Sequence, residues 1–186
     1  KKYRPESEVL VIEKKSFPRH KVGESLIIDI NRVLVDMEAL EAVDAAGFVT
    51  KYGSTFVWGD DRSPKTFQWP EWQQAGYHLP YTWHVERPKY DQILADAAEG
   101  FGAQIAFEHS VVEPIMDGER VEGLVVRDSD GQTHEVRATY SVDCGGFGGP
   151  LTRRLAGHKM DSKLRNIATW GYHKNIGWRE SLNGTE

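Results

Sequence analysis

The stretch Val9-Leu10-Val11-Ile12-Glu13 decides the fold expected for this chain. Its first four residues form a short apolar run rich in β-branched side chains, which is typical of a strand buried on both faces of a parallel sheet. A parallel strand needs a neighbour that is reached through a crossover connection. Nothing before Val9 supplies that neighbour, so we expect the chain to begin partway through a βαβ unit. Glu13 stands where dinucleotide-binding folds place an acid that hydrogen-bonds a ribose hydroxyl, although an acid after a strand is also commonly a solvated loop residue.

Two helices are expected on either side of a strand-rich segment. Between residues 23 and 47 the apolar positions recur every three or four residues, which predicts one amphipathic helix that stops at Gly47. These positions are Leu26, Ile27, Ile30, Val33, Leu34, Met37, Leu40 and Val43. Pro88 suits the first turn of a second helix, which we expect to end at Gly100 or Gly102.

Strands are predicted in two groups. Residues 54–58 and 81–85 are rich in aromatic and β-branched side chains, and the loop between them holds a further short strand around residues 66–69. Residues 104–107, 110–116, 121–127 and 134–142 predict a β-meander, with hairpin turns at Asp117-Gly118 and Asp130-Gly131. A dense glycine cluster, Asp143-Cys144-Gly145-Gly146-Phe147-Gly148-Gly149, follows directly and indicates backbone brought close to another group.

Composition excludes several classes of function. The net charge of -5 and the pI near 5.8 argue against nucleic-acid binding, because the basic residues are scattered. No apolar run reaches the ~18 residues of a membrane span, and the single cysteine, Cys144, requires no oxidising compartment, so we expect a cytoplasmic protein that contacts no membrane. The seven histidines lack metal-ligand spacing, and Gly23-Glu24-Ser25 lacks the second glycine of a hydrolase nucleophile elbow, so we expect no metal and no serine hydrolase.

Three segments together resemble flavin-dependent halogenases, which belong to the FAD-dependent monooxygenase superfamily. They are Phe-Pro-Arg-His-Lys-Val-Gly-Glu-Ser-Leu at residues 17–26, Gly-Phe-Val-Thr-Lys-Tyr-Gly-Ser-Thr-Phe-Val-Trp-Gly at 47–59, and Trp-His-Val-Glu-Arg-Pro-Lys-Tyr-Asp-Gln-Ile-Leu at 83–94. The resemblance implies an α/β fold: a partial FAD-binding, doubly wound domain of the Rossmann-like, glutathione-reductase type, with an antiparallel β-meander and part of a substrate domain. It assigns residues 1–50 and 86–157 to the FAD-binding domain, and residues 51–85 and 158–186 to the substrate and halogenation region.

The same resemblance implies a set of FAD contacts. They are Glu13, Arg19, Val22, Gly23, Glu24, Ser25, Arg87, Val112, Asp143, Gly145 and Gly146. The start of the first predicted helix would offer exposed amides to an anionic or electron-rich group, and the alternative is an ordinary N-cap at Ser25 or nearby. Arg87 would pair with a phosphate or a polar flavin edge, and its alternative is a salt bridge with Glu86 or Asp91.

Lys51 carries the chemistry that the resemblance implies. In this family reduced FAD and oxygen give a flavin hydroperoxide, halide attacks it to yield hypohalous acid, and a lysine holds that oxidant or is halogenated by it. A compact ammonium can donate to the oxidant, and its neutral amine is favoured if burial lowers the pKa. Apolar shelter is expected from Phe48, Val49, Tyr52 and Phe56, while the alternative is a surface lysine at the end of the preceding helix. Trp58 and Trp83 are candidate substrate contacts, although tryptophans more often pack in the core.

The resemblance therefore implies halogenation of an electron-rich aromatic substrate, of the phenol or carrier-bound pyrrole type, with FAD and a halide ion as cofactors. A separate flavin reductase would supply the reduced flavin. Two alternatives stay open: a flavin-dependent hydroxylase or reductase of the same superfamily, and a non-catalytic FAD-binding fragment. The family's Gly-x-Gly-x-x-Gly turn and its Trp-x-Trp-x-Ile-Pro segment are both missing from the 186 residues, so we expect this stretch alone to be incompetent for catalysis.

Overall fold

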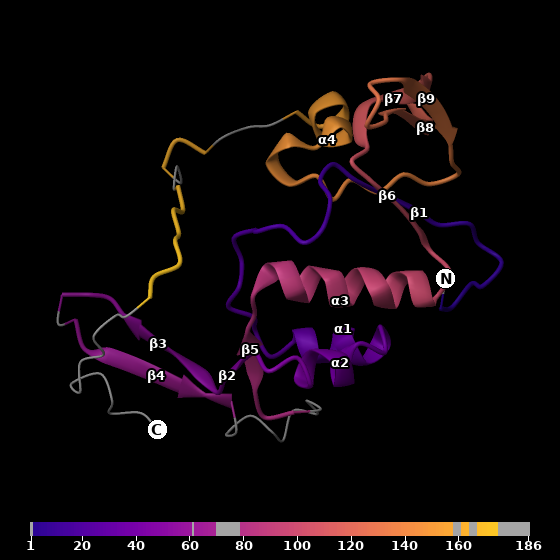
Figure 1. Cartoon of the computed structure of the whole chain (residues 1–186). Coiled ribbons are helices and arrows are strands. Elements are labelled where there is room, and N and C mark those ends of the chain that lie inside the picture. The colour runs from indigo at the N-terminus through magenta and orange to yellow at the C-terminus, as the bar shows by residue number, and fades with distance from the viewer. Residues whose placement is uncertain (1, 61, 70–78, 158–160, 164–166, 175–186) are drawn as a thin grey trace.

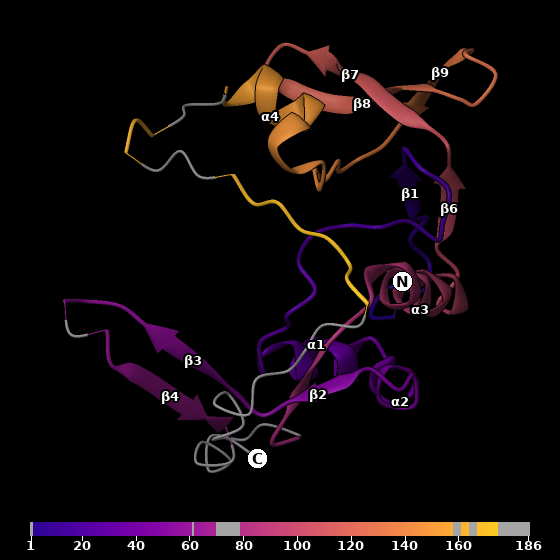
Figure 2. The ribbon, with the colours of Figure 1, turned by 60° about the vertical axis from the view of Figure 1, so that its left-hand side comes forward.

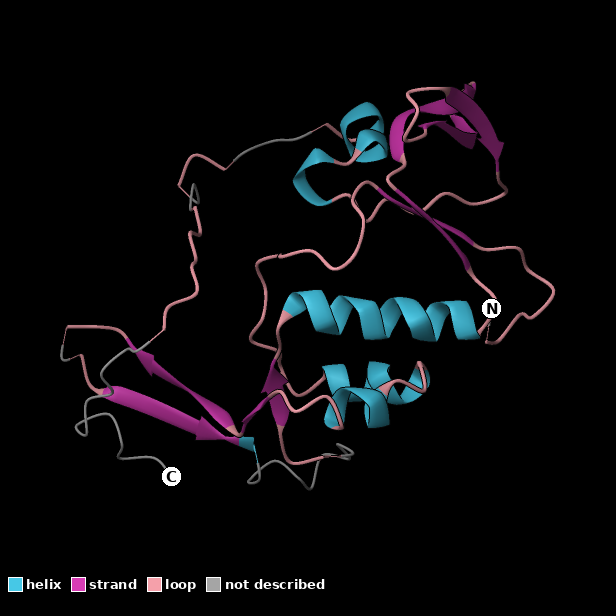
Figure 3. Cartoon of the chain, in the orientation of Figure 1, coloured by secondary structure: helices cyan, strands magenta, loops and turns pink. Residues whose placement is uncertain are grey.

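The computed structural model describes residues 2–60, 62–69, 79–157, 161–163 and 167–174. Helices α1, α2 and α3 gather in the middle of the molecule, and strands lie on either side of them (Figure 3). The elements are β1 (Leu10–Glu13), α1 (Ile30–Asp36), α2 (Leu40–Asp44), β2 (Val49–Lys51), β3 (Gly53–Val57), β4 (Pro64–Gln68), β5 (Thr82–His84), α3 (Arg87–Gly100), β6 (Gln104–Phe107), β7 (Ser110–Asp117), β8 (Arg120–Arg127), β9 (Thr133–Arg137) and α4 (Pro150–Leu155).

The first strand has its parallel neighbour downstream in the chain. β1 pairs in parallel with β6, in a register that runs from Leu10 opposite Gln104 to Glu13 opposite Phe107. The chain enters β6 directly from α3, so the βαβ unit is closed within the described residues (Figure 1). The prediction that residues 104–107 open the β-meander is wrong, because these residues extend the β1 sheet instead.

The prediction that the first strand is buried on both faces is also wrong. Leu10 and Val11 are 43% and 41% exposed. Within the described residues β1 has one hydrogen-bonded neighbour, β6, and this two-stranded sheet leaves part of its apolar surface uncovered. The parallel pairing was predicted correctly, but the burial was not.

The single helix predicted between residues 23 and 47 is two short helices, α1 and α2. Glu38 adopts a φ of 54°, in the left-handed region that a continuing helix does not use, and so separates them. Helical spacing continues across the break because both pieces pack on one core. Before α1 the backbone is strand-like: Leu26 donates to the Trp83 carbonyl at 3.1 Å, and Val85 donates to the Glu24 carbonyl at 2.8 Å.

The core lies where α1, α2, α3 and β5 meet. Its buried members are Leu34, Ala39, Val43, Trp83, Val85 and Tyr90. Asn31 ties α1 to this core, since its buried side-chain amide donates to the Tyr81 carbonyl at 2.7 Å. The second predicted helix is confirmed as α3, with Pro88 in its first turn.

The meander is a three-stranded antiparallel sheet in the order β7-β8-β9. The predicted glycine turns are confirmed, since Gly118 and Gly131 have φ values of 57° and 82°. β9 ends at Arg137, five residues before the predicted end at Val142. α4 packs on β7 at one side of this sheet (Figure 2).

The β3–β4 hairpin projects from the rest of the molecule (Figure 2). It confirms the short strand predicted around residues 66–69, which the structure places at Pro64–Gln68. Among the described residues, no helix combines the length and the apolar character required to cross a bilayer.

Candidate functional site

A small three-stranded arrangement builds the site. β2 pairs antiparallel with β5 on one side, with Lys51 opposite Thr82 and Val49 opposite His84. On the other side Ser25 forms an antiparallel bridge with the same His84. Lys51 and Ser25 therefore come from two segments that flank β5, and this explains how residues 26 positions apart in sequence meet.

The amine of Lys51 is held by two oxygen atoms. Its Nζ donates to Ser25 Oγ and to the Leu26 carbonyl oxygen, each at 2.8 Å. It also lies 5.0 Å from the centroid of the Trp69 ring. Burial lowers the pKa of this amine below that of an ordinary lysine. Lys51 is thus a positioned, partly desolvated amine rather than a solvated lysine at a helix end.

The shelter of Lys51 differs from the one expected. Val49, Tyr52 and Phe56 are all exposed, and Phe48 packs against the core, where its ring makes a T-shaped contact with the ring of Tyr90. The ring beside the amine belongs to Trp69, which is buried. The spacing of residues in the sequence does not place Trp69 beside Lys51, because the β3–β4 hairpin separates them. The hairpin brings them together, since the backbone N–H of Trp69 donates to the Tyr52 carbonyl at 2.8 Å.

His84 is a second titratable group on this surface, and it was not predicted as a site residue. Burial, together with the positive charge of Lys51, lowers the pKa of His84. It helps to line a hollow of about 390 Å³ beside the bridge. The hollow is lined by Glu24, Ser25, Gly47, Phe48, Val49, His84, Val85, Glu86 and Tyr172.

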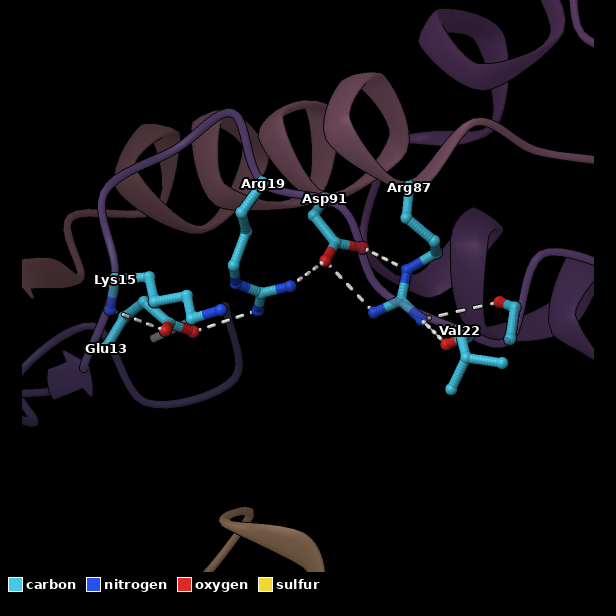
Figure 4. A network of polar contacts seen from close by, with 7 residues as sticks. Glu13, Lys15, Arg19, Val22, Arg87 and Asp91 are labelled. Carbon is cyan, nitrogen blue, oxygen red and sulfur yellow. Dashed lines mark hydrogen bonds and ion pairs between the residues drawn. The ribbon is translucent and has the colours of Figure 1, made fainter. Parts of the chain in front are cut away.

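A network of four charged side chains joins the loop after β1 to α3 (Figure 4). Arg19 donates to Glu13 at 2.9 Å and to Asp91 at 2.8 Å. Arg87 donates to both carboxylate oxygens of Asp91, at 2.6 and 3.0 Å. Asp91 thus accepts from two guanidinium groups, and this couples the Glu13 end of β1 to the first turn of α3.

Arg87 also holds the backbone of the loop. Its Nη1 donates to the Val22 carbonyl at 2.9 Å and to the Gly23 carbonyl at 3.4 Å. The alternative of a salt bridge within α3 is therefore present, and the Asp91 carboxylate occupies the planar fork that the expected phosphate contact would need. Gly23 has a φ of 98°, and a Cβ there would lie 3.3 Å from Arg87 Nη1, so the close approach favours glycine.

The pKa of Glu13 is lowered although its partial burial opposes this, because Arg19 and the backbone N–H of Lys15 both donate to the carboxylate. Glu13 ends β1 at the carboxyl edge of the parallel pair, which is the edge where open α/β sheets bind ligands. The exposed amides of a helix start expected at Gly23, Glu24 and Ser25 are not found, because the first helix begins at Ile30. The alternative of an N-cap at Ser25 or nearby is wrong as well, because the N-cap of α1 is Asp29.

Val112 lies in a β-bulge of β7. The register with β8 shifts between Val111 and Glu113, and a bulge leaves one residue outside the regular ladder. The backbone of Val112 consequently lies outside the regular pairing of β7 with β8.

The glycine-rich segment is organised by Asp143. Its carboxylate accepts from the Gly145 N–H at 2.8 Å, and from both the N–H and the hydroxyl of Thr152, at 2.9 and 3.0 Å. These backbone hydrogen bonds lower the pKa of Asp143. A Cβ at Gly149 would lie 2.2 Å from the Asp143 carboxylate, so the turn requires glycine there. Gly146 has a φ of 63° and contributes a second glycine-dependent position.

The two candidate substrate tryptophans have different environments. Trp83 is 1% exposed and packs in the core against Tyr81, so it supports the fold. Trp58 is 54% exposed on the hairpin, with its ring beside Phe56 and 5.9 Å from the Lys65 amine. No group of three or more His, Cys, Asp or Glu side chains within the described residues is arranged to hold a metal ion.

Comparisons with known proteins place the chain among flavoproteins. Residues 30–172 match the family described as FAD binding domain. A tryptophan 2-halogenase from Chondromyces crocatus is 33% identical over 170 residues, which is 90% of this chain and 31% of that protein. A 1H-pyrrole-2-carbonyl-[peptidyl-carrier protein] brominase from Pseudoalteromonas luteoviolacea is 30% identical over 172 residues, covering 90% of this chain and 39% of its own length. The chain therefore spans about a third of the curated relatives that it matches.

Solved structures agree with this. CmlS, a flavin-dependent halogenase, is 30% identical with a TM-score of 0.72, covering 83% of this chain and 28% of the other. The myxobacterial chondrochloren halogenase CndH is 28% identical with a TM-score of 0.63, and the match covers 72% of this chain and 30% of CndH. The resemblance to flavin-dependent halogenases is confirmed, and so is a partial FAD-binding fold.

The described residues fit FAD. Glu13 offers acceptor oxygens at the ligand-binding edge of a parallel strand. The glycine-rich turn before α4 faces the loop that follows β1 in both views (Figures 1 and 2). Gly145 and Gly146 have no side chains, as a close approach of a dinucleotide to the main chain requires.

Proposed function

The chain belongs to the FAD-binding domain family, and from that premise we propose that it carries the flavin-binding and lysine-bearing part of a flavin-dependent halogenase. The observation that supports this most strongly is the Lys51 amine, held by Ser25 and Leu26 beside the Trp69 ring. FAD, when bound and reduced, supplies with oxygen and halide the hypohalous acid that the reaction consumes. The role of the protein is then to direct that oxidant.

Each part of the proposed reaction has a physical counterpart. Lys51 donates a hydrogen bond to the oxidant, or offers its neutral amine, and the lowered pKa makes the neutral form more accessible. Trp69 shields one side of the amine from water, which strengthens electrostatic interactions there. An electron-rich aromatic substrate would meet the oxidant beside this amine.

The finer assignments are part of the same proposal. We assign FAD contacts to Glu13, Val112, Gly145 and Gly146, and structural roles beside the cofactor to Arg19, Arg87 and Asp143. Arg87 holds the loop that contains Val22, Gly23 and Glu24. Residues 1–50 and 86–157 would form the FAD-binding part, and residues 51–85 and 158–186 the substrate part, of which 61, 70–78, 158–160, 164–166 and 175–186 lie outside the described residues.

The substrate and the partners remain proposals too. Relatives with curated functions act on tryptophan and on carrier-bound pyrrole, so they do not separate the substrate branches. We retain a phenol or a carrier-bound pyrrole as the substrate class, with Trp58 as a contact. A separate flavin reductase and a cytoplasmic location complete the proposal.

The test replaces Lys51 by Ala in the complete protein, supplied with a flavin reductase, halide and an aromatic substrate. Halogenated product should fall at least ~100-fold, within the range for losing one group that acts on the reacting atoms, while bound FAD is unchanged. Lys2→Ala is the matched control, since Lys2 also lies over an aromatic ring, that of Phe101, and contacts no residue assigned to the cofactor or the substrate. Undiminished halogenation by the Lys51→Ala protein would remove the lysine from the mechanism, and hydroxylated product in its place would favour a flavin hydroxylase.

A further inference from the structure

The contact between Ser25 and Lys51 gives Ser25 a function other than the cofactor contact expected from the sequence. Ser25 Oγ lies 2.8 Å from Lys51 Nζ, and the Leu26 carbonyl oxygen lies at the same distance. Both acceptors come from one short segment, so a single backbone position sets the location of both. Among the described residues, Ser25 Oγ is the one side-chain oxygen that accepts a hydrogen bond from this amine.

The segment that carries the two acceptors is itself fixed to the core. Leu26 donates to the Trp83 carbonyl at 3.1 Å, and Ser25 bridges His84. On the far side of β5, Lys51 is anchored by the pairing of β2 opposite Thr82. The lysine side chain thus spans β5 between two anchored segments, which limits the positions its amine can adopt.

The tetrahedral geometry of Nζ leaves one direction in which the amine can make a further contact. Nζ is tetrahedral, with one bond to its own carbon and two positions directed to Ser25 Oγ and Leu26 O. A single position is left. In the ammonium form it carries the third N–H, and in the neutral amine it carries the lone pair, so in both forms the group that meets the oxidant points away from Ser25 and Leu26.

We propose that Ser25 is a positioning residue for the Lys51 amine, which it orients toward hypohalous acid, and that it is not an FAD ligand. This rests on the proposed function of Lys51. The hydroxyl of Ser25 selects the orientation that the Leu26 carbonyl alone leaves free, because one hydrogen bond fixes an atom pair and two fix the rotation of the amine. The main effect of Ser25 is then on where the oxidant is delivered, not on whether it forms.

The experiment compares Ser25→Ala and Ser25→Thr in the complete protein, with flavin reductase and halide. We expect Ser25→Ala to lower kcat for halogenation about tenfold, the scale of one hydrogen bond to a charged donor, with FAD affinity and the KM for the aromatic substrate unchanged. A soluble trap such as monochlorodimedone should capture more free hypohalous acid per flavin oxidised. Ser25→Thr keeps a hydroxyl and should restore most of the yield.

The outcomes separate this inference from the proposed function. If Ser25→Ala weakens FAD binding while halogenation per bound flavin stays at the native level, Ser25 is a cofactor residue and the positioning role is refuted. An unchanged product yield in both variants refutes it as well. A different variant tests the proposed function itself: continued halogenation by the Lys51→Ala protein would refute it.

Discussion

Asp91→Asn is the substitution that tests most severely how the loop after β1 is held. The Asp91 carboxylate is 9% exposed and accepts three hydrogen bonds, one from Arg19 and two from Arg87. Asparagine has nearly the same shape, but its amide presents two donors, so at least one guanidinium N–H would face another donor. The substitution also leaves two neighbouring guanidinium groups without the charge between them.

The magnitude follows from burial. Removing one partner of a buried ion pair costs ~3–5 kcal/mol, because the remaining charge stays desolvated. Arg19 and Arg87 are 17% and 21% exposed in their side chains, so water recovers part of that loss and the low end applies, ~3 kcal/mol. For a cooperatively unfolding domain of ~150–250 residues that corresponds to a fall in Tm of ~6–12 °C.

The assay is thermal unfolding followed by circular dichroism, with FAD affinity measured in parallel by quenching of flavin fluorescence. Glu122→Gln is the matched control, since Glu122 pairs with Arg137 at 3.0 Å on the exposed face of the meander. That exposed pair should contribute less than ~1 kcal/mol to the free energy of unfolding. Affinity for FAD should fall in Asp91→Asn, because the loop from Glu13 to Gly23 loses its anchor on α3. Equal unfolding temperatures for the two variants would refute the reasoning.

Three further predictions concern single residues. The amine of Lys51 has a lowered pKa, so its rate of acylation, followed by mass spectrometry at a series of pH values, should reach half its maximum below pH 10.5, and a midpoint at 10.5 or above contradicts this. Because the folded state binds fewer protons than the unfolded state above the lowered pKa, this group makes the free energy of unfolding rise as the pH rises through that pKa. The pKa of Glu13 is also lowered, so its carboxylate stabilises the fold above pH 4.5 and loses that effect as pH falls through the folded pKa. Glu13→Gln should therefore lower the free energy of unfolding in urea at pH 7, and its difference from the native protein should shrink as the pH is lowered below 4.5; a difference that does not change with pH contradicts this. Gly149→Ala should lower the free energy of unfolding by ~1–3 kcal/mol, because the new Cβ displaces the Asp143 carboxylate. Gly148→Ala is the control: its Cβ meets nothing within 4 Å, so it should lower that free energy by less than ~1 kcal/mol, and equal stability of the two variants in urea would contradict the account of the turn.

The sequence predicted the elements that local signals determine. Pro88 at the start of α3 and the glycines at 118 and 131 have conformational preferences that hold in almost any context, and the structure confirms each. The pairing of β1 with β6 could not be read locally, since it joins segments 94 residues apart (10 to 104) and depends on the crossover through α3. The break at Glu38 was missed because residues with positive φ other than glycine have no reliable sequence signal.

The candidate site divides in the same way. Lys51 was selected through its resemblance to a halogenase segment, and the structure adds contacts that no spacing encodes, those with Ser25, Leu26 and Trp69. The role expected for Arg87 depended on which partner its guanidinium would find. Asp91 lies one helical turn away and supplies a bidentate acceptor, so the fork is satisfied within the protein.

The most direct test of the central claim is a structure of the complete protein with FAD bound. The account predicts that Lys51 Nζ keeps its contacts with Ser25 and Leu26 and lines an enclosed path that continues to the isoalloxazine ring. An amine that opens to bulk solvent on a surface remote from that ring would contradict it.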